Sequence, residues 1–168
     1  MKFHKILFSI SLLILCFISS ISFSQTGNTN GQYDDAIKQA YILLQYIQNQ
    51  DKNSLKEKFT ETSFQTKKEF SKMLNSSNIK WANNTINQNG IPEKGDLLIS
   101  GWKTVSKESQ STFYINITFF FKGKNVKYTN SDDHICFNFF KNQAGEYCFN
   151  GIMFFKKEDF IKAKKITN

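Results

Sequence analysis

The sequence predicts an α+β fold in which three amino-terminal helices pack on one face of a four- to five-stranded antiparallel sheet. Up to about residue 75, apolar residues recur at steps of three and four, which is the period of an amphipathic helix. From residue 96 onward they recur at steps of two, which is the period of a half-buried strand. Turn-forming Gly, Asn and Asp residues separate the later segments, as expected of consecutive hairpins.

Residues 1–24 are predicted to be a secretory signal peptide. A short basic start precedes a nearly unbroken apolar run from Ile6 to Ile21, and the small residues Ser22 and Ser24 stand three and one positions before Gln25. The run holds 16 residues, several of them serines, whereas a retained membrane anchor needs about 20 apolar residues. We expect cleavage after Ser24 and a secreted or periplasmic mature chain without a membrane span. An uncleaved anchor is the alternative.

The mature chain is predicted to contain a flexible polar leader, residues 25–33, and one domain, residues 34–168. All 22 basic residues of the whole chain are lysines, and loss of Lys2 and Lys5 with the signal lowers the formal net charge from +8 to +6. Arginine, the residue best suited to phosphates and bases, is absent, and the lysines are scattered. We therefore expect no nucleic-acid partner.

Three helices are predicted in the amino-terminal half. The first runs from about Asp34 to Gln50, with acidic residues in its first turn, where the helix dipole favours them. Two S/T-x-x-E sequences, Ser54–Glu57 and Thr66–Glu69, predict capping boxes at the starts of two short helices that end near Thr60 and Asn75. The buried stripe of the first helix is expected to consist of Ile37, Ala40, Tyr41, Leu44 and Ile47.

Residues 79–95 are predicted to be a linker with room for a short strand, because they are rich in Asn and contain Pro92. Four strands follow, and a short carboxyl-terminal helix is predicted from about Lys157 to Lys165. The strands are expected over Leu97–Val105, Thr112–Phe121, His134–Phe140 and Glu146–Phe155.

Alternation along these strands predicts an aromatic side that faces the core and a mixed, polar side. On the last strand, Tyr147, Phe149, Met153 and Phe155 are assigned to the core side. On the earlier strands, the core-facing residues are expected to be Phe113, Ile115, Ile117, Ile135, Phe137 and Phe139.

Cys136 and Cys148 are the two thiols of the mature chain, and both fall on the polar side. In an exported protein, two such thiols are candidates for a disulfide. A hairpin turn centred on Asn142 puts them directly opposite each other, as a cross-strand bridge requires. A turn centred one residue later separates them by a diagonal step. The bridged and the free states both stay open at this point.

No catalytic residue, cofactor or metal site is predicted. His134 is the only histidine of the mature chain, and no CxxC or HExxH sequence is present. Asp132 and Asp133 precede His134, which raises the hypothesis of an Asp–His pair. The segment is a strong loop signal, however, and acidic loop residues beside a histidine are usually solvated.

The predicted functional site is a binding surface on the polar side of the sheet. Aromatic and amide side chains together suit contacts with a sugar, a peptide or another subunit. The alternative is an ordinary half-solvated sheet face with the usual content of Thr and Asn. The candidate binding residues are Trp102, Tyr114, Asn116, Thr118, His134, Asn138 and Asn150.

Three parts of the chain resemble elements of a known fold family. Ala36–Asp51 looks like a long first helix that ends in a small-polar-acidic step, and Leu55–Phe59 and Phe70–Leu74 look like two short closing helices. Gly145–Ile152 looks like a final strand that enters a Gly-Ile step. With these parts in this order, about Asp34 to Phe155 resembles the nuclear-transport-factor-2-like (cystatin-like α+β) superfamily.

The resemblance implies a cone-like domain in which helices and a strongly bent sheet enclose a pocket. Members of the superfamily include isomerases, dehydratases and polyketide cyclases, and the catalytic members carry an Asp/His or Tyr/Asp set inside the cone. The core-facing strand positions of this chain carry no acid or base, so no catalytic residue is carried over. Dimerisation through the sheet face is common in the superfamily, which implies a homodimer as the first partner.

These features predict an exported, non-catalytic binding or scaffold domain of the cell envelope. The expected partner is a small molecule, a glycan, an envelope protein or a second copy of the chain. The alternatives are a small pocket enzyme of the isomerase or lyase type, and a purely structural dimerising domain.

Overall fold

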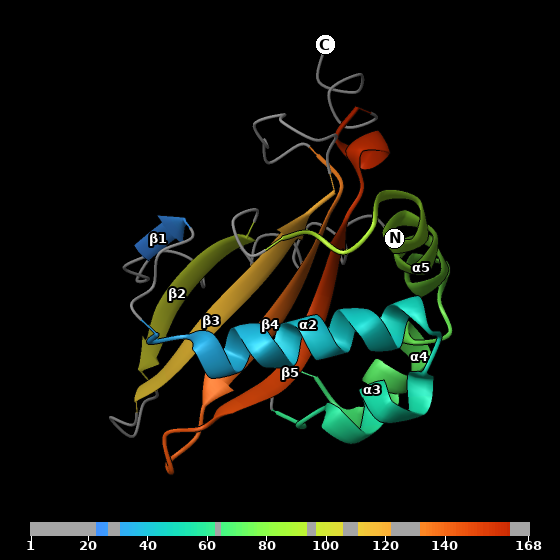
Figure 1. Ribbon diagram of the computed structural model, residues 1–168. Helices are drawn as coiled ribbons and strands as arrows, with labels where there is room; N and C mark the ends of the chain where they lie inside the picture. Colours follow the sequence, from blue (N-terminus) through green and yellow to red (C-terminus); the bar gives the residue numbers. More distant parts are fainter. Residues whose placement is uncertain are drawn as a thin grey trace, which may run out of the picture.

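The computed structural model describes residues 23–26, 31–62, 65–93, 97–105, 111–121 and 132–161. The helices and strands in these residues are β1 (Phe23–Thr26), α2 (Asp34–Gln48), α3 (Lys52–Lys58), α4 (Lys67–Met73), α5 (Ser77–Asn89), β2 (Leu97–Val105), β3 (Ser111–Phe120), β4 (His134–Lys141) and β5 (Tyr147–Phe155). Figure 1 shows α2 crossing the sheet, with α3 and α4 near its carboxyl-terminal end and α5 beside them. The predicted α+β class is confirmed.

The strands pair antiparallel in the order β1-β2-β3-β4-β5, so each strand lies beside its neighbour in sequence. The predicted bounds of the last four strands agree with β2 to β5 to within one residue. The hydrophobic core lies between the helices and one face of this sheet. We call it the helix-covered face, and its residues are Leu97, Ile99, Ile115, Ile117, Phe119, Ile135, Phe137, Phe139, Tyr147, Phe149, Ile152 and Phe154.

The first predicted helix is confirmed as α2, and it ends at Gln48 because the backbone turns there. Gln50 adopts a left-handed φ of 57°, and its N–H donates to the carbonyl of Ile47 at 3.1 Å. The N–H of Asp51 donates to the carbonyl of Tyr46 at 2.8 Å. This pair of bonds is a Schellman motif, which stops a helix by satisfying its last carbonyls.

The helix caps agree with the sequence at α4 and differ at α3. At α4, the Glu69 N–H donates to the Thr66 hydroxyl and the Thr66 N–H donates to the Glu69 carboxylate, which is the predicted capping box. At α3, the prediction of Ser54 as the cap is wrong. The cap is Asp51, whose carboxylate accepts from the Ser54 N–H at 3.0 Å and from the Ser54 hydroxyl at 2.6 Å. These bonds lower the pKa of Asp51.

The linker predicted over residues 79–95 is wrong, because most of it forms α5. Ile79, Ala82 and Ile86 recur at helical spacing and are buried against the rest of the core. Asn83 is buried too, and its Nδ2 donates to the carbonyls of Ile47 at 3.0 Å and Gln48 at 2.7 Å. The Asn83 amide of α5 therefore satisfies two backbone carbonyls at the carboxyl-terminal end of α2. The sequence does not reveal this role, because Asn83 is one of many asparagines in the segment.

An aromatic cluster fixes the short helices to the last strand. The rings of Phe59 and Phe70 stack at 4.1 Å, and Phe149 of β5 meets them edge-on at 6.1 and 5.7 Å. The Thr60 N–H donates to the Phe149 carbonyl at 2.7 Å, so the chain after α3 lies along the outer edge of β5. Packing of this kind keeps that edge of the sheet from pairing with another strand.

A β-bulge in β5 changes which residues face the helices. Asn138 pairs with Gly151 and Phe139 pairs with Phe149, which leaves Asn150 as the extra residue. Beyond the bulge, Ile152 and Phe154 lie on the helix-covered face. The assignment of Met153 and Phe155 to the core side is therefore wrong, and Met153 is 39% exposed.

Of the two states left open for Cys136 and Cys148, the structure has the free one, because neither described cysteine is bridged. The hairpin pairs Lys141 with Tyr147, so its turn centres on residue 144 rather than 142. With the bulge added, Cys136 lies opposite Met153, and Cys148 lies opposite Phe140. Burial raises the pKa of Cys136 to about 12.

The two ends of the chain lie partly outside the described residues. The predicted signal peptide and leader are described only at residues 23–26 and 31–33, and β1 includes the expected cleavage position after Ser24. In the predicted carboxyl-terminal helix, residues 157–161 are helical and residues 162–165 are not described. No helix among the described residues is long and apolar enough to cross a membrane.

Candidate binding surface

The sheet face that points away from the helices holds the predicted binding residues in ordered rows. The strand register sets Trp102, Tyr114 and Phe140 side by side in one row, and Ser100, Asn116 and Asn138 in the next. We call this surface the open face, and its residues are Leu98, Ser100, Trp102, Thr104, Thr112, Tyr114, Asn116, Thr118, Phe120, His134, Cys136, Asn138, Phe140, Cys148, Asn150, Gly151, Met153 and Phe155.

The first row of the open face is aromatic. The rings of Trp102 and Tyr114 stack at 5.4 Å with an interplanar angle of 11°, and Tyr114 meets Phe140 at 6.3 Å. Trp102 and Phe140 are half-buried, whereas Tyr114 between them is 8% exposed. Burial raises the pKa of the Tyr114 phenol. The row offers Trp102 and Phe140 for contact, with Tyr114 holding them in place.

The second row is built from amides. Asn138 donates through Nδ2 to Oδ1 of Asn116 at 2.8 Å, and both side chains are half-buried. Gly151 follows in this row, and a Cβ built there would lie 3.4 Å from Oε1 of Gln65 and 3.8 Å from Cβ of Asn138. Gln65, in the chain before α4, therefore reaches the edge of the amide row. Sequence reasoning missed it because it lies far from β5 along the chain.

Asn150 does not offer its side chain at the surface as the sequence suggested. It is the extra residue of the bulge and only 6% exposed. Its Oδ1 is buried without a hydrogen-bond partner in the described residues. A bulge often redirects a side chain in this way. Thr118 is buried as well, at the centre of the sheet, so neither residue can contact a ligand without rearrangement.

His134 is a packed aromatic residue rather than an exposed base. Its ring stacks on Phe155 at 4.4 Å and tilts against Phe120 at 4.9 Å. Nδ1 donates to the backbone carbonyl of Asp132 at 2.7 Å, so this hydrogen bond joins the ring to the main chain of the loop. Burial lowers the pKa of His134 despite that bond and the nearby Asp133 carboxylate. The imidazole is therefore neutral at pH 7.

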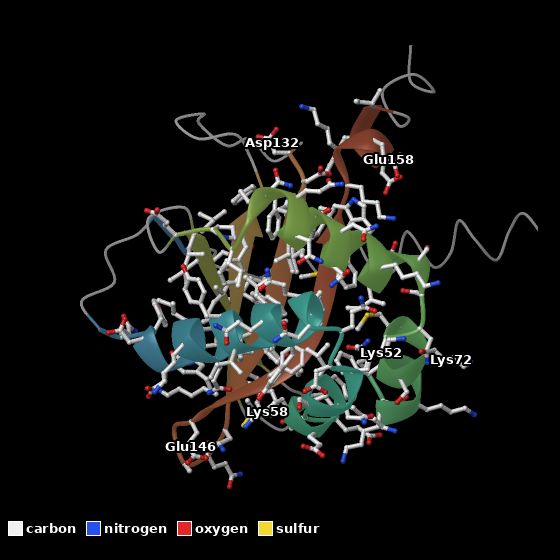
Figure 2. All side chains as sticks on the ribbon, turned by 45° about the vertical axis from the view of Figure 1, so that its right-hand side comes forward. Lys52, Lys58, Lys72, Asp132, Glu146 and Glu158 are labelled. Carbon is white, nitrogen blue, oxygen red and sulfur yellow. The ribbon has the colours of Figure 1, made fainter. Side chains whose placement is uncertain are left out.

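Charged side chains are absent from the described part of the open face. Figure 2 shows Asp132 and Glu158 at one end of the sheet, Glu146 at the other, and Lys52 and Lys72 beside the short helices. Within the described residues, no three His, Cys, Asp or Glu side chains form a group that could hold a metal ion. The surface consists of aromatic, amide, hydroxyl and aliphatic groups.

The chain matches no family model, no curated protein and no solved structure. The resemblance to the nuclear-transport-factor-2-like superfamily therefore stays a prediction, and the residues themselves carry the functional argument.

Proposed function

We propose that this chain is an exported, non-catalytic binding domain of the cell envelope that holds a neutral, hydroxyl-rich ligand, such as a glycan, on the open face of its sheet. A cone-like form of the α+β fold, as in the resembled superfamily, is part of this proposal. The observation that carries it is the uncharged open face, on which an aromatic row borders an amide row.

The composition of the chain makes that surface unusual. The protein contains 22 lysines and 14 acidic residues, yet the described open face contains none of either. A sheet face that only meets water tolerates Lys and Glu at no cost to the core. Amides donate and accept hydrogen bonds toward sugar hydroxyls, and aromatic rings pack on the C–H faces of sugar rings. Neutral glycans fit both features, whereas anionic polymers do not.

A pocket enzyme of the same fold is the alternative, and it has less support. Such an enzyme needs an acid or base inside the fold, where it can meet a substrate. Among the buried residues of the helix-covered face, the ionisable group is the Tyr147 phenol, whose pKa burial raises. His134, the other titratable candidate, packs between aromatic rings on the open face.

Trp102 fluorescence tests the proposal directly. Trp81 and Trp102 are the two tryptophans, so a Trp81→Phe background makes emission report on the open face. The chain of residues 25–168 would be titrated with a neutral N-acetylglucosamine tetramer and with a cello-oligosaccharide. We expect a saturable change in emission with at least one of them. Loss of one amide hydrogen bond in Asn138→Ala should raise its Kd roughly tenfold.

Lys103→Ala is the matched control, because Lys103 follows Trp102 in β2 and is exposed on the opposite side of the strand. This variant should bind as the parent does. Absence of a saturable change with both sugars, or equal affinities for Asn138→Ala and the parent, would contradict the glycan proposal. The sheet-face homodimer predicts a different result, namely a concentration-dependent mass that Trp102→Ala reduces.

Export is tested separately. The protein recovered from the periplasm or the medium of expressing cells should begin at Gln25 when its amino-terminal sequence is determined. A product that begins at Met1 and stays in the membrane fraction would contradict cleavage.

A further inference from the structure

Among the described residues, β1 is the only strand that pairs with the outer edge of β2. β1 pairs with only four of the nine residues of β2, from Phe23 opposite Gly101 to Thr26 opposite Leu98. Within the described residues, the part of β2 from Trp102 to Thr104 has no strand beside it on that side. The opposite edge of the sheet differs, because the chain after α3 lies along β5.

Signal cleavage would remove half of that cover. Cleavage after Ser24 takes away the pairs of Phe23 with Gly101 and of Ser24 with Ser100. Gln25 and Thr26 then become the first two residues of the chain, and a two-residue terminal pairing frays readily. A nine-residue strand without proline is left as a free edge, which is a ready template for another strand.

We propose that removal of residues 1–24 uncovers the edge of β2, and that the mature chain pairs there with a second copy of itself, β2 against β2 in antiparallel register. The proposal rests on the cleavage position given under the proposed function. The full chain itself shows that this edge accepts an antiparallel strand, because β1 occupies it. Strand addition of this kind is a general mode of association through main-chain hydrogen bonds.

Antiparallel pairing of β2 with a second copy can be symmetric, and in that register the sequence of β2 brings no like charges together. Gly101 is the middle residue of β2, so a two-fold axis there pairs all nine residues, Leu97 with Val105 and Ile99 with Lys103 of the other copy. Lys103 is the only charged residue of β2, and in this register the two lysines do not face each other. The two open faces then form one continuous surface, and each retains its aromatic and amide rows.

The proposal is tested by measuring the molar masses of three forms of this chain by size-exclusion chromatography with light scattering. The first contains residues 22–168 and keeps β1. The second has the same length and carries Phe23→Pro and Ser24→Pro, which remove strand pairing without shortening the chain. The third is the mature chain, residues 25–168. We expect the monomer mass for the first chain and about twice that mass for the other two.

Circular dichroism and the thermal midpoint of each chain establish that all three are folded, so a change in mass reports on association. Equal masses for the three chains would overturn the edge proposal. A dimer that forms whether or not Phe23→Pro and Ser24→Pro are present, and that Trp102→Ala abolishes, would also overturn it. That result would favour the sheet-face dimer. A mature protein that begins elsewhere than Gln25 contradicts the cleavage position, yet the first two chains still test the edge. The sugar titration is a separate test, because its outcome does not depend on whether the chain is a monomer or a dimer.

Discussion

The two faces of the sheet are built by the same alternation but differ in what their residues are suited to do. Along β4, Phe137 and Phe139 are fully buried under the helices, whereas Asn138 and Phe140 are half-buried on the open face. The buried part of the helix-covered face is apolar except for the Tyr147 phenol, and helix side chains fill the space above it. Lys103 and Lys141 lie on the same side of the sheet, at its exposed end. The open face mixes aromatic rings with amides and contains no charge in its described part.

The two faces of the sheet contribute unequally to the stability of the fold. Burial of aromatic and aliphatic area against α2 to α5 supplies the main driving force for folding, which is non-directional and proportional to area. The Asn116–Asn138 pair and the Trp102–Tyr114 stack contribute less to folding, because all of these side chains except Tyr114 are only half-buried. Under the proposed function, these side chains and the uncharged surface around them serve to hold an occupant.

The largest expected effect comes from truncating two phenylalanines of β4, one on each face of the sheet. Phe137→Ala removes a ring that is 0% exposed and should lower the free energy of unfolding by about 3–5 kcal/mol. Phe140→Ala truncates a half-buried ring and should cost about 1–2 kcal/mol. Urea denaturation of both variants measures the difference. Equal losses would mean that the open face is packed as tightly as the covered one.

A smaller loss in the free energy of unfolding is expected when the buried amide of Asn83 is removed from the helix layer. Asn83→Leu leaves the carbonyls of Ile47 and Gln48 without their buried donor and should cost about 2 kcal/mol. Asn84→Leu is the matched control, since Asn84 is the next residue of α5 and is exposed. It should change the denaturation midpoint very little. A loss in Asn84→Leu as large as that in Asn83→Leu would show that the two hydrogen bonds of Asn83 are not its source, since leucine has a higher helix propensity than asparagine.

The strands β2 to β5 and α2 could be predicted because their periodicity is strong over eight or more residues. The period of two in β3 and of three to four in α2 follows directly from which side chains must be buried. The capping box at Thr66 is equally local. In contrast, α5 was hidden because its stripe consists of only Ile79, Ala82 and Ile86 among polar residues, and the use of Asn83 as a long-range cap leaves no local signal.

The membership of the open face could also be predicted, but its details could not. Alternation alone puts Trp102, Tyr114, Asn116 and Asn138 on one side of a sheet. The bulge at Asn150 depends on how β5 meets the rest of the sheet, and it inverts every position after it. For the same reason the state of the two thiols could not be predicted, since a turn centred two residues later than Asn142 and one extra residue in β5 move Cys136 and Cys148 out of register.

The smallest expected effect concerns His134, which tests whether the aromatic end of the open face is as dry as the structure indicates. Burial lowers its pKa, so in the folded state the neutral form is favoured. In the unfolded chain its pKa is about 6.5. Below that pH the unfolded chain binds a proton that the folded protein resists, and the free energy of unfolding therefore falls. The loss ends once the pH is below the folded pKa.

The contribution of His134 to the free energy of unfolding can be isolated by urea denaturation from pH 8 to pH 5. The chain of residues 25–168 would be compared with its His134→Phe variant. The variant keeps an aromatic ring against Phe155 and Phe120 but cannot titrate. The urea midpoint of the parent should therefore fall relative to that of the variant as the pH falls. His134 is the only histidine of that chain, so the pH titration of its imidazole NMR signals can be read without assignment. A pKa of about 6.5 or above in the folded state would mean that water reaches the ring. The contrast between the two faces would then extend to this end of the sheet, because the open face would be solvated there as well as at its amide row.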